Sequence, residues 1–224
     1  MPKLHLSLST SFFLLLNLCA YSPAGATGTN IALNADILRI QTTWENIKFK
    51  EKDPDHQLRD IEALGKSADE IVAKYPNQAA PLIWDGIVTS ENAGMASMFS
   101  ALSLAKRARD LLLKAEKIDP AALDAGAPTS LGVLYYRVPG FPVGFGSTTT
   151  AAKYLKEALT LAPDGMDANY FSGDFLFQQG DYKGAQVVLK HALTLPPQPD
   201  RPDWDYHRRA VIRELLDKIA KKLG

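Results

Sequence analysis

The stretch MDANYFSGDFLFQQGDYKGAQVVLKHALTLPP, residues 166–197, decides the fold of this chain. It contains two apolar segments of helical length, separated by Gly180-Asp181, a pair that ends one helix and caps the next. Small or apolar residues recur at helical spacing at Gly173, Ala185, Leu189 and Ala192. Glycine and alanine let two helices approach closely, and a leucine fills the gap between them. The stretch therefore predicts two antiparallel helices, the second of which ends before Pro197, because proline cannot continue a helix.

The same pattern occurs twice more toward the N-terminus. One copy, with seven extra residues between its helices, has Gly132, Ala151, Leu155, Ala158 and Pro163 in the same roles. An earlier copy, with about ten extra residues, has Gly86, Ala108, Leu112, Ala115 and Pro120. The helix-ending prolines at 76, 120, 163 and 197 lie 44, 43 and 34 residues apart. A single helix pair cannot bury its apolar face alone, so successive pairs must stack on one another. The repeated pattern therefore predicts an all-α superhelix.

The segments outside the repeats extend this helical pattern. Residues 30–75 predict two further helices, and residues 201–224 predict one long amphipathic helix that caps the end of the stack. Its basic residues are expected on a solvated face: Arg208, Arg209, Arg213, Lys218, Lys221 and Lys222. We expect about nine helices and no strand, arranged as an N-terminal helical segment (27–78), the repeats (79–200) and the capping helix (201–224).

The sequence RVPGFPVGFG, residues 137–146, interrupts the second helix pair. Two prolines and three glycines cannot continue a helix, so this segment predicts a rigid loop. Two interpretations of Phe141 and Phe145 stand with equal weight. The rings either plug the end of a helix pair, or the loop folds over the groove edge and offers at least one ring to a ligand or partner, with Arg137 at its base.

Residues 1–26 have the pattern of a secretory signal peptide. Lys3 is followed by the apolar run SFFLLLNLCA and by Ala24-Gly25-Ala26, so we expect cleavage after Ala26 and a periplasmic or secreted protein. Lipid attachment at Cys19 is the alternative, which Leu18 disfavours because a small residue usually precedes the lipidated cysteine. Cleavage at Ala26 removes the only cysteine, so the fold must depend on its core rather than on disulfides. No later apolar run is long enough to span a bilayer.

Composition and motifs favour a binding protein over an enzyme. The 25 basic and 25 acidic residues give no net charge, so the overall balance indicates neither a nucleic acid nor an anionic membrane as the partner. The three histidines that remain after cleavage, at 56, 191 and 207, lack metal-ligand spacing, and neither a phosphate-binding loop nor a nucleophile elbow is present. We expect no cofactor. A hydrolase that uses acidic residues of a groove, Asp174 above all, is the least favoured alternative.

From about Ala79 to the C-terminus the chain resembles the tetratricopeptide-repeat superfamily. In that superfamily the first helix of each repeat lines a concave groove, which implies groove positions at Tyr136, Arg137, Tyr170, Asp174 and Phe177. The earliest copy would add Ile83, Ile87 and Glu91. Such a surface is aromatic and weakly polar, and suits a peptide or an apolar ligand.

The sequence VPGF, followed by a glycine-rich turn and AAKYLKEALTLAP, further resembles the T-component of TRAP transporters. This resemblance implies a periplasmic accessory that associates with the solute-binding subunit of a transporter and takes a hydrophobic ligand. The alternative is a general periplasmic assembly adaptor that holds partner peptides in the groove.

Overall fold

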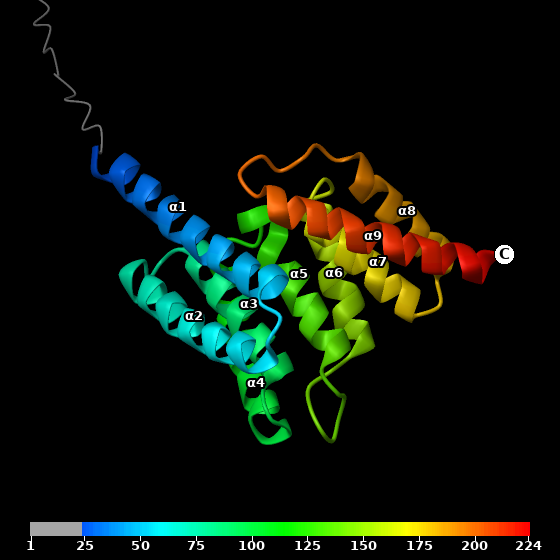
Figure 1. Ribbon diagram of the computed structural model, residues 1–224, viewed down its shortest axis with the longest axis horizontal. Coiled ribbons are helices and arrows are strands. Elements are labelled where there is room, and N and C mark those ends of the chain that lie inside the picture. The colour runs from blue at the N-terminus through cyan, green and yellow to red at the C-terminus, as the bar shows by residue number, and fades with distance from the viewer. Residues whose placement is uncertain (1–23) are drawn as a thin grey trace, which may run out of the picture.

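The computed structural model describes residues 24–224, so Cys19 and most of the expected signal peptide lie outside the described residues. Within this range it contains nine α-helices, one π-helix and no strand (Figure 1). The elements are α1 (Ala24–Glu45), η1 (Asn46–Lys50), α2 (Pro54–Lys74), α3 (Ala79–Met95), α4 (Met98–Ile118), α5 (Ala122–Arg137), α6 (Thr148–Leu161), α7 (Met166–Gln178), α8 (Tyr182–Thr194) and α9 (Pro202–Leu223). None of these helices is long and apolar enough to cross a membrane. The predicted all-α helical repeat is confirmed.

Three antiparallel helix pairs, α3/α4, α5/α6 and α7/α8, form the repeats, and they have the register that the sequence predicts. A Cβ atom added to Gly132 would lie 2.6 Å from Cγ of Leu155, and one added to Gly86 would lie 2.7 Å from Cγ of Leu112. A Cβ atom added to Gly173 would lie closer still to Cγ of Leu189. The backbones therefore approach at each glycine, and the leucine of the partner helix fills the contact.

The alanines predicted to face the partner helix are all fully buried: Ala108, Ala115, Ala151, Ala158, Ala185 and Ala192. A larger side chain at any of them would separate the two helices of a pair. The glycine, leucine and alanine positions together confirm all three copies of the repeat, including the earliest copy.

The two sets of extra residues adopt different structures. In the second repeat they form the loop after Arg137, as predicted. In the first repeat they lengthen the helices instead, and α3 and α4 are joined by only Ala96 and Ser97. The expected insertion between the helices of that repeat is therefore wrong. The physical reason is composition, because residues 91–110 contain alanine, leucine, methionine, lysine and arginine but no proline.

Local signals end and begin the helices as the sequence indicates. Gly180 adopts a left-handed φ of 81° after α7, and the Asp181 side chain accepts a hydrogen bond of 2.9 Å from the Gly184 amide. Ser147 caps α6 by accepting from the Thr150 amide at 3.2 Å. Residues 123–125 are left-handed, so the regular part of α5 begins at residue 126 and Pro128 lies in its first turn.

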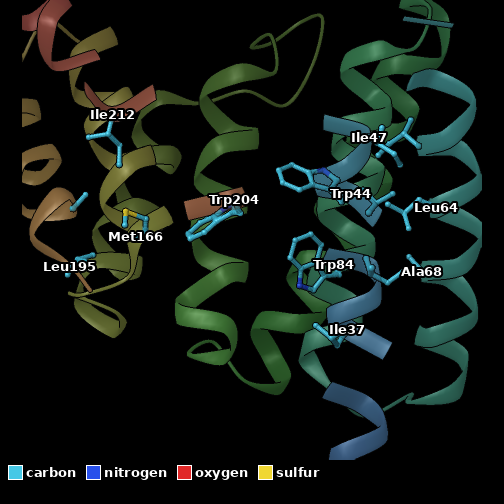
Figure 2. Packing of buried hydrophobic residues seen from close by; sticks show 14 of the residues in the cluster. Ile37, Trp44, Ile47, Leu64, Ala68, Trp84, Met166, Leu195, Trp204 and Ile212 are labelled. Carbon is cyan, nitrogen blue, oxygen red and sulfur yellow. The ribbon is translucent and has the colours of Figure 1, made fainter. Parts of the chain in front are cut away.

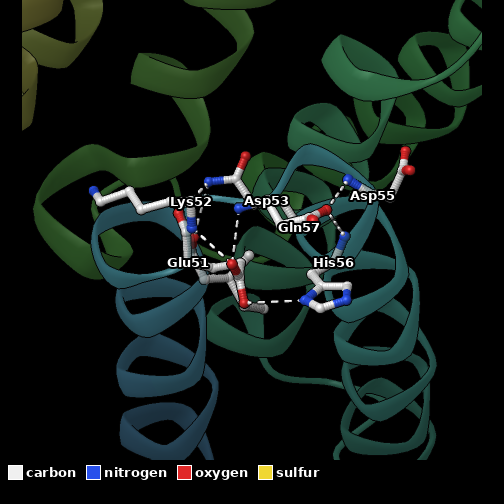
Figure 3. A network of polar contacts seen from close by, with 7 residues as sticks. Glu51, Lys52, Asp53, Asp55, His56 and Gln57 are labelled. Carbon is white, nitrogen blue, oxygen red and sulfur yellow. Dashed lines mark hydrogen bonds and ion pairs between the residues drawn. The ribbon is translucent and has the colours of Figure 1, made fainter.

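The turn between η1 and α2 is held by side chains that satisfy backbone groups (Figure 3). Asp53 accepts hydrogen bonds from the Asp55 and His56 amides at 2.9 and 3.1 Å. Glu51 accepts from the Lys52 and Asp53 amides at 2.7 and 2.8 Å. These bonds to backbone amides hold the pKa of both carboxyls below their usual values. The network therefore holds the turn at which the chain enters α2.

The end of α1 and the start of α9 meet on the inner side of the repeats, a contact that the sequence does not reveal. The Arg201 Nε atom lies 2.6 Å from Glu45 of α1, and its guanidinium lies over the rings of Trp84 and Trp204 at 5.5 and 4.6 Å. Trp44 contacts Trp84 edge to face, with ring centroids 6.1 Å apart. Figure 2 shows Trp204 projecting between the repeat helices toward Trp84 and Trp44. Helix α9 therefore caps the stack and also enters it.

This inward position corrects the expectation of a fully solvated basic face on α9. Arg208 and Arg209 have side chains only 13% and 12% exposed. Arg209 donates to the carbonyls of Leu193 and Leu195 at 3.1 and 2.8 Å, so it closes the C-terminal end of α8. The remaining basic residues of the helix, at 213, 218, 221 and 222, are exposed as expected.

A buried carboxyl lies in the middle of α3. Asp85 is fully buried, accepts a hydrogen bond of 3.1 Å from Thr89, and lies 3.3 Å from the Arg107 guanidinium, which also pairs with Asp69. Burial raises the pKa of Asp85 to about 6 from the usual 3.8, although the Arg107 charge acts in the opposite direction. Because this pKa is raised, Asp85 binds a proton on folding, and its stabilising contribution is present below about pH 4 and lost as the pH rises through 6.

We therefore expect the pH dependence of stability to change in the variant Asp85→Asn, which keeps the shape of the side chain but cannot ionise. Between pH 4 and pH 7 the natural protein should lose about 2 kcal/mol of unfolding free energy relative to this variant. Urea unfolding of both proteins at the two pH values measures the difference. If the two proteins differ in unfolding free energy by the same amount at pH 4 and at pH 7, burial does not raise the pKa of Asp85.

Candidate functional site

The candidate site is a cluster of aromatic and arginine side chains on α5 and α7, with α9 lying against it. We call this set the arginine–aromatic cluster, and its members are Tyr136, Arg137, Asp167, Tyr170, Phe171, Asp174, Gln178 and Arg208. Figure 1 shows α9 crossing in front of α7. Three of the five predicted groove residues, Tyr136, Arg137 and Asp174, are in direct contact.

Asp174 is the polar centre of this cluster. Its Oδ2 atom accepts hydrogen bonds from the Tyr136 hydroxyl at 2.7 Å, from Arg137 Nη2 at 3.2 Å and from Gln178 Nε2 at 3.1 Å. Burial raises the pKa of the Tyr136 hydroxyl well above its usual range, so this tyrosine remains a donor throughout the pH range in which proteins fold. Asp174 thus positions three donors on two neighbouring repeats.

Two arginines extend the cluster around one aromatic pair. The Arg208 guanidinium lies 4.3 Å from the centroid of Tyr170 and 5.0 Å from that of Phe171, and its Nε lies 2.8 Å from Asp167. The Arg137 guanidinium lies 5.9 Å from the centroid of the same Phe171 ring. The two arginines differ in accessibility, because the side chain of Arg137 is 55% exposed and that of Arg208 only 13%. Arg137 is therefore the cation that a partner can reach.

Other predicted residues lie outside this cluster. Phe177 faces Tyr182 of α8, with ring centroids 5.5 Å apart, and packs on the main core. In the earliest repeat Ile83 is fully buried and Glu91 pairs with Lys48, so α3 offers less open surface than its register implies. Helix α1 covers this part of the inner side.

The loop between α5 and α6 places its two phenylalanines in different environments. Phe145 is half-buried, with its ring centroid 5.4 Å from that of Tyr135 and 4.7 Å from the Arg109 guanidinium of α4. Phe141 is 95% exposed at the tip. Gly146 lies so close to the Val138 carbonyl that a Cβ atom would overlap it, and its amide donates to the Pro139 carbonyl at 2.9 Å. The loop is thus a fixed structure in which one ring packs and the other does not.

We expect the two alanine variants of this loop to differ in stability. Phe145→Ala should lower the unfolding free energy by about 1–2 kcal/mol, because it removes a half-buried ring from its contacts with Tyr135 and Arg109. Phe141→Ala should leave it within about 0.5 kcal/mol of the natural value. Thermal or urea unfolding of both variants decides the matter, and equal losses would contradict the separate environments of the two rings.

The groove positions of the repeat that the resemblance implies also include Asp167 and Gln178, but sequence reasoning missed two members of the cluster, Phe171 and Arg208. Phe171 is not a groove position of the repeat, and Arg208 belongs to a helix whose charge pattern suggests solvent. The one available signal is Trp204, because a large apolar residue among the polar residues at the start of this helix indicates that this end is buried. This signal does not reveal which surface of the repeats buries Trp204.

Each of the three histidines at 56, 191 and 207 lies next to an aromatic ring or a carboxylate. His207 stacks on Phe49 with ring centroids 4.2 Å apart, and His191 lies 2.9 Å from Asp164. His56 lies 3.7 Å from Glu51. Across residues 24–224 no group of three or more potential ligands has the arrangement of a metal site.

Comparison with known proteins agrees with this fold. A family model described as tetratricopeptide repeat matches residues 143–206, which run from the end of the loop through α6, α7 and α8 into α9. The structure is similar to the crystal structure of a thermophilic tetratricopeptide-repeat protein from Thermus thermophilus. That match has a TM-score of 0.55 and 15% sequence identity, and covers 86% of this chain and 95% of the other. No curated protein sequence matches the chain.

These findings support the resemblance to the tetratricopeptide-repeat superfamily. The fold is a tetratricopeptide-like helical repeat, with an added N-terminal hairpin and a C-terminal helix that enters the inner side. The resemblance to transporter T-components concerns function and is taken up as a proposal.

Proposed function

We propose that this protein is an extracytoplasmic scaffold that binds a segment of a partner protein at the arginine–aromatic cluster. The exposed guanidinium of Arg137 carries this proposal. It is held by Asp174 and by two aromatic rings, yet more than half of its side chain remains in solvent. A guanidinium fixed in this way can donate to a carboxylate or backbone carbonyl of a partner without losing much side-chain entropy.

The remaining surface of the cluster suits the same purpose. Tyr136, Tyr170 and Phe171 supply half-buried aromatic area, and the exposed side chain of Gln178 supplies an amide next to Arg137. Aromatic residues and arginine dominate the energetics of protein interfaces. Oδ2 of Asp174 already accepts three hydrogen bonds, which favours a positioning role for this carboxylate over the hydrolase alternative.

Within this proposal the partner is the solute-binding subunit of a TRAP-type transporter. The turn VPGF and the helix that follows support it through their resemblance to T-components, and the pattern of residues 1–26 supports the extracytoplasmic location. The alternative partner is a set of unrelated peptides, as expected of a general assembly adaptor, and the exposed aromatic surface favours that interpretation equally.

Site-specific crosslinking in the native organism tests the proposal. A photoreactive amino acid is placed at Gln178, beside Arg137, and at Val187, an exposed position on α8, as the control. Capture of a solute-binding subunit at Gln178 but not at Val187 supports the transporter accessory, whereas several unrelated proteins support the adaptor. A Gln178 variant that captures nothing more than the Val187 variant contradicts the scaffold itself.

A further inference from the structure

Two turns at one end of the repeats expose large apolar side chains. Phe99, next to the turn between α3 and α4, is 97% exposed, and Phe141 and Val143, in the loop between α5 and α6, are 95% and 65% exposed. Figure 1 shows both turns projecting beyond the helices at the same end of the molecule. The loop lies against α4 near its start, because a Cβ atom added to Gly144 would be 3.4 Å from Leu102 of that helix. We call Phe99, Phe141 and Val143 the apolar tip.

The loop holds its part of the tip in place. The amides of Val143 and Gly144 both donate to the Gly140 carbonyl at 3.1 Å, and the Ser147 amide donates to the Tyr135 carbonyl at 2.8 Å. The packed ring of Phe145 anchors the loop to α4. An exposed phenylalanine in such a loop is unfavourable in water, and its backbone is already ordered for a contact.

The charge around the tip has a definite pattern. Residues 92–105 and 138–152 contain no charged side chain. Beyond these segments the first charges on the four helices are Glu91, Lys106, Arg137 and Lys153. Glu91 is paired with Lys48, and Arg137 with Asp174, whereas Lys106 and Lys153 are exposed. The tip is thus apolar and uncharged, with a predominantly basic rim set back from it.

From this arrangement we infer that the apolar tip inserts into the interfacial region of a lipid bilayer that contains anionic lipids. Two convex turns with separate phenylalanines fit a fluid bilayer, which deforms around each ring, whereas a protein partner would need a pocket for each. The rings would enter the boundary between headgroups and acyl chains, and the set-back lysines would lie at the height of the lipid phosphates. This contact uses the apolar tip and the two lysines, whereas Arg137 stays paired with Asp174 in the arginine–aromatic cluster.

Vesicle flotation tests this inference with the full chain. The probe is a vesicle of equal parts phosphatidylglycerol and phosphatidylcholine, compared with one of phosphatidylcholine alone. The double variant Phe99→Ser/Phe141→Ser is compared with the natural protein and with Val187→Ser, which alters an apolar side chain on α8 that is 69% exposed. Every variant keeps the apolar run at residues 11–20, so only differences between variants count.

We expect the double variant to bind anionic vesicles about tenfold or more weakly, because each ring contributes a large part of the apolar transfer. Val187→Ser should bind like the natural protein, and neutral vesicles should bind all three weakly. Equal binding by the double variant and the natural protein would overturn the inference.

A second measurement reports on the tip directly. In a chain with Cys19→Ser, an environment-sensitive dye is attached through Val143→Cys or, as the matched control, through Val187→Cys. Anionic vesicles should shift the emission of the dye at position 143 to the blue and leave that at position 187 unchanged. A dye at position 143 that shifts with a purified protein partner and not with vesicles would overturn the lipid surface in favour of a protein pocket.

Discussion

Replacing Trp204 with alanine will lower the free energy of unfolding by about 3–5 kcal/mol, the range typical of a buried tryptophan. The side chain is only 5% exposed, and the guanidiniums of Arg201 and Arg208 lie over its ring. Its loss would leave a cavity where α9 meets α1 and α3, and both arginines would lose an aromatic contact.

The control for Trp204→Ala is Tyr206→Ala, two residues further along the same helix. Tyr206 is 69% exposed, so its removal should change the unfolding free energy by no more than about 0.5 kcal/mol. Urea unfolding at neutral pH measures both, and hydrogen exchange shows whether the start of α9 is released first. Equal unfolding midpoints for the two variants would mean that α9 does not enter the inner side of the repeats.

Replacing Gly173 with leucine will cost about 3 kcal/mol, at the upper end of what overpacking costs. A Cβ atom alone would already overlap the side chain of Leu189, and this leucine is fully buried and cannot move aside. Gly94→Leu is the matched control, because Gly94 lies near the end of α3 with no atom within 4 Å of an added Cβ. Thermal unfolding that shows the same midpoint for both leucine variants would contradict the register of the repeats.

The sequence predicts the repeats well because their signals are local and recur. A glycine on the first helix, followed by an alanine, a leucine and an alanine at fixed spacing on the second, marks each helix pair. In all three copies the structure places the glycine against the leucine and buries both alanines. Breaks are equally local, since Pro139 and Pro142 predict the loop correctly. The extra residues of the first repeat are harder to assign, because a missing proline distinguishes a longer helix from a loop only weakly.

The sequence predicts only the part of the candidate site that depends on the repeats. Tyr136, Arg137 and Asp174 follow from the groove positions that the resemblance to tetratricopeptide repeats implies. Phe171 and Arg208 do not, because their roles depend on where α9 lies. That position is set by contacts between residues as distant in sequence as Glu45 and Arg201. No local pattern encodes such a pairing, and the charge pattern of α9 suggests the opposite.

The binding of a captured partner by Arg137→Ala and Arg213→Ala tests the central claim most directly. Both variants remove an exposed arginine, but only Arg137 belongs to the arginine–aromatic cluster. Isothermal titration uses the partner protein that was identified by crosslinking at Gln178. Its dissociation constant should be about tenfold or more higher for Arg137→Ala than for the natural protein, because the variant loses a charge-assisted hydrogen bond. Arg213→Ala should bind like the natural protein, and both variants should keep nearly its thermal midpoint. Equal affinities for the two variants would contradict the claim that the cluster is the partner site.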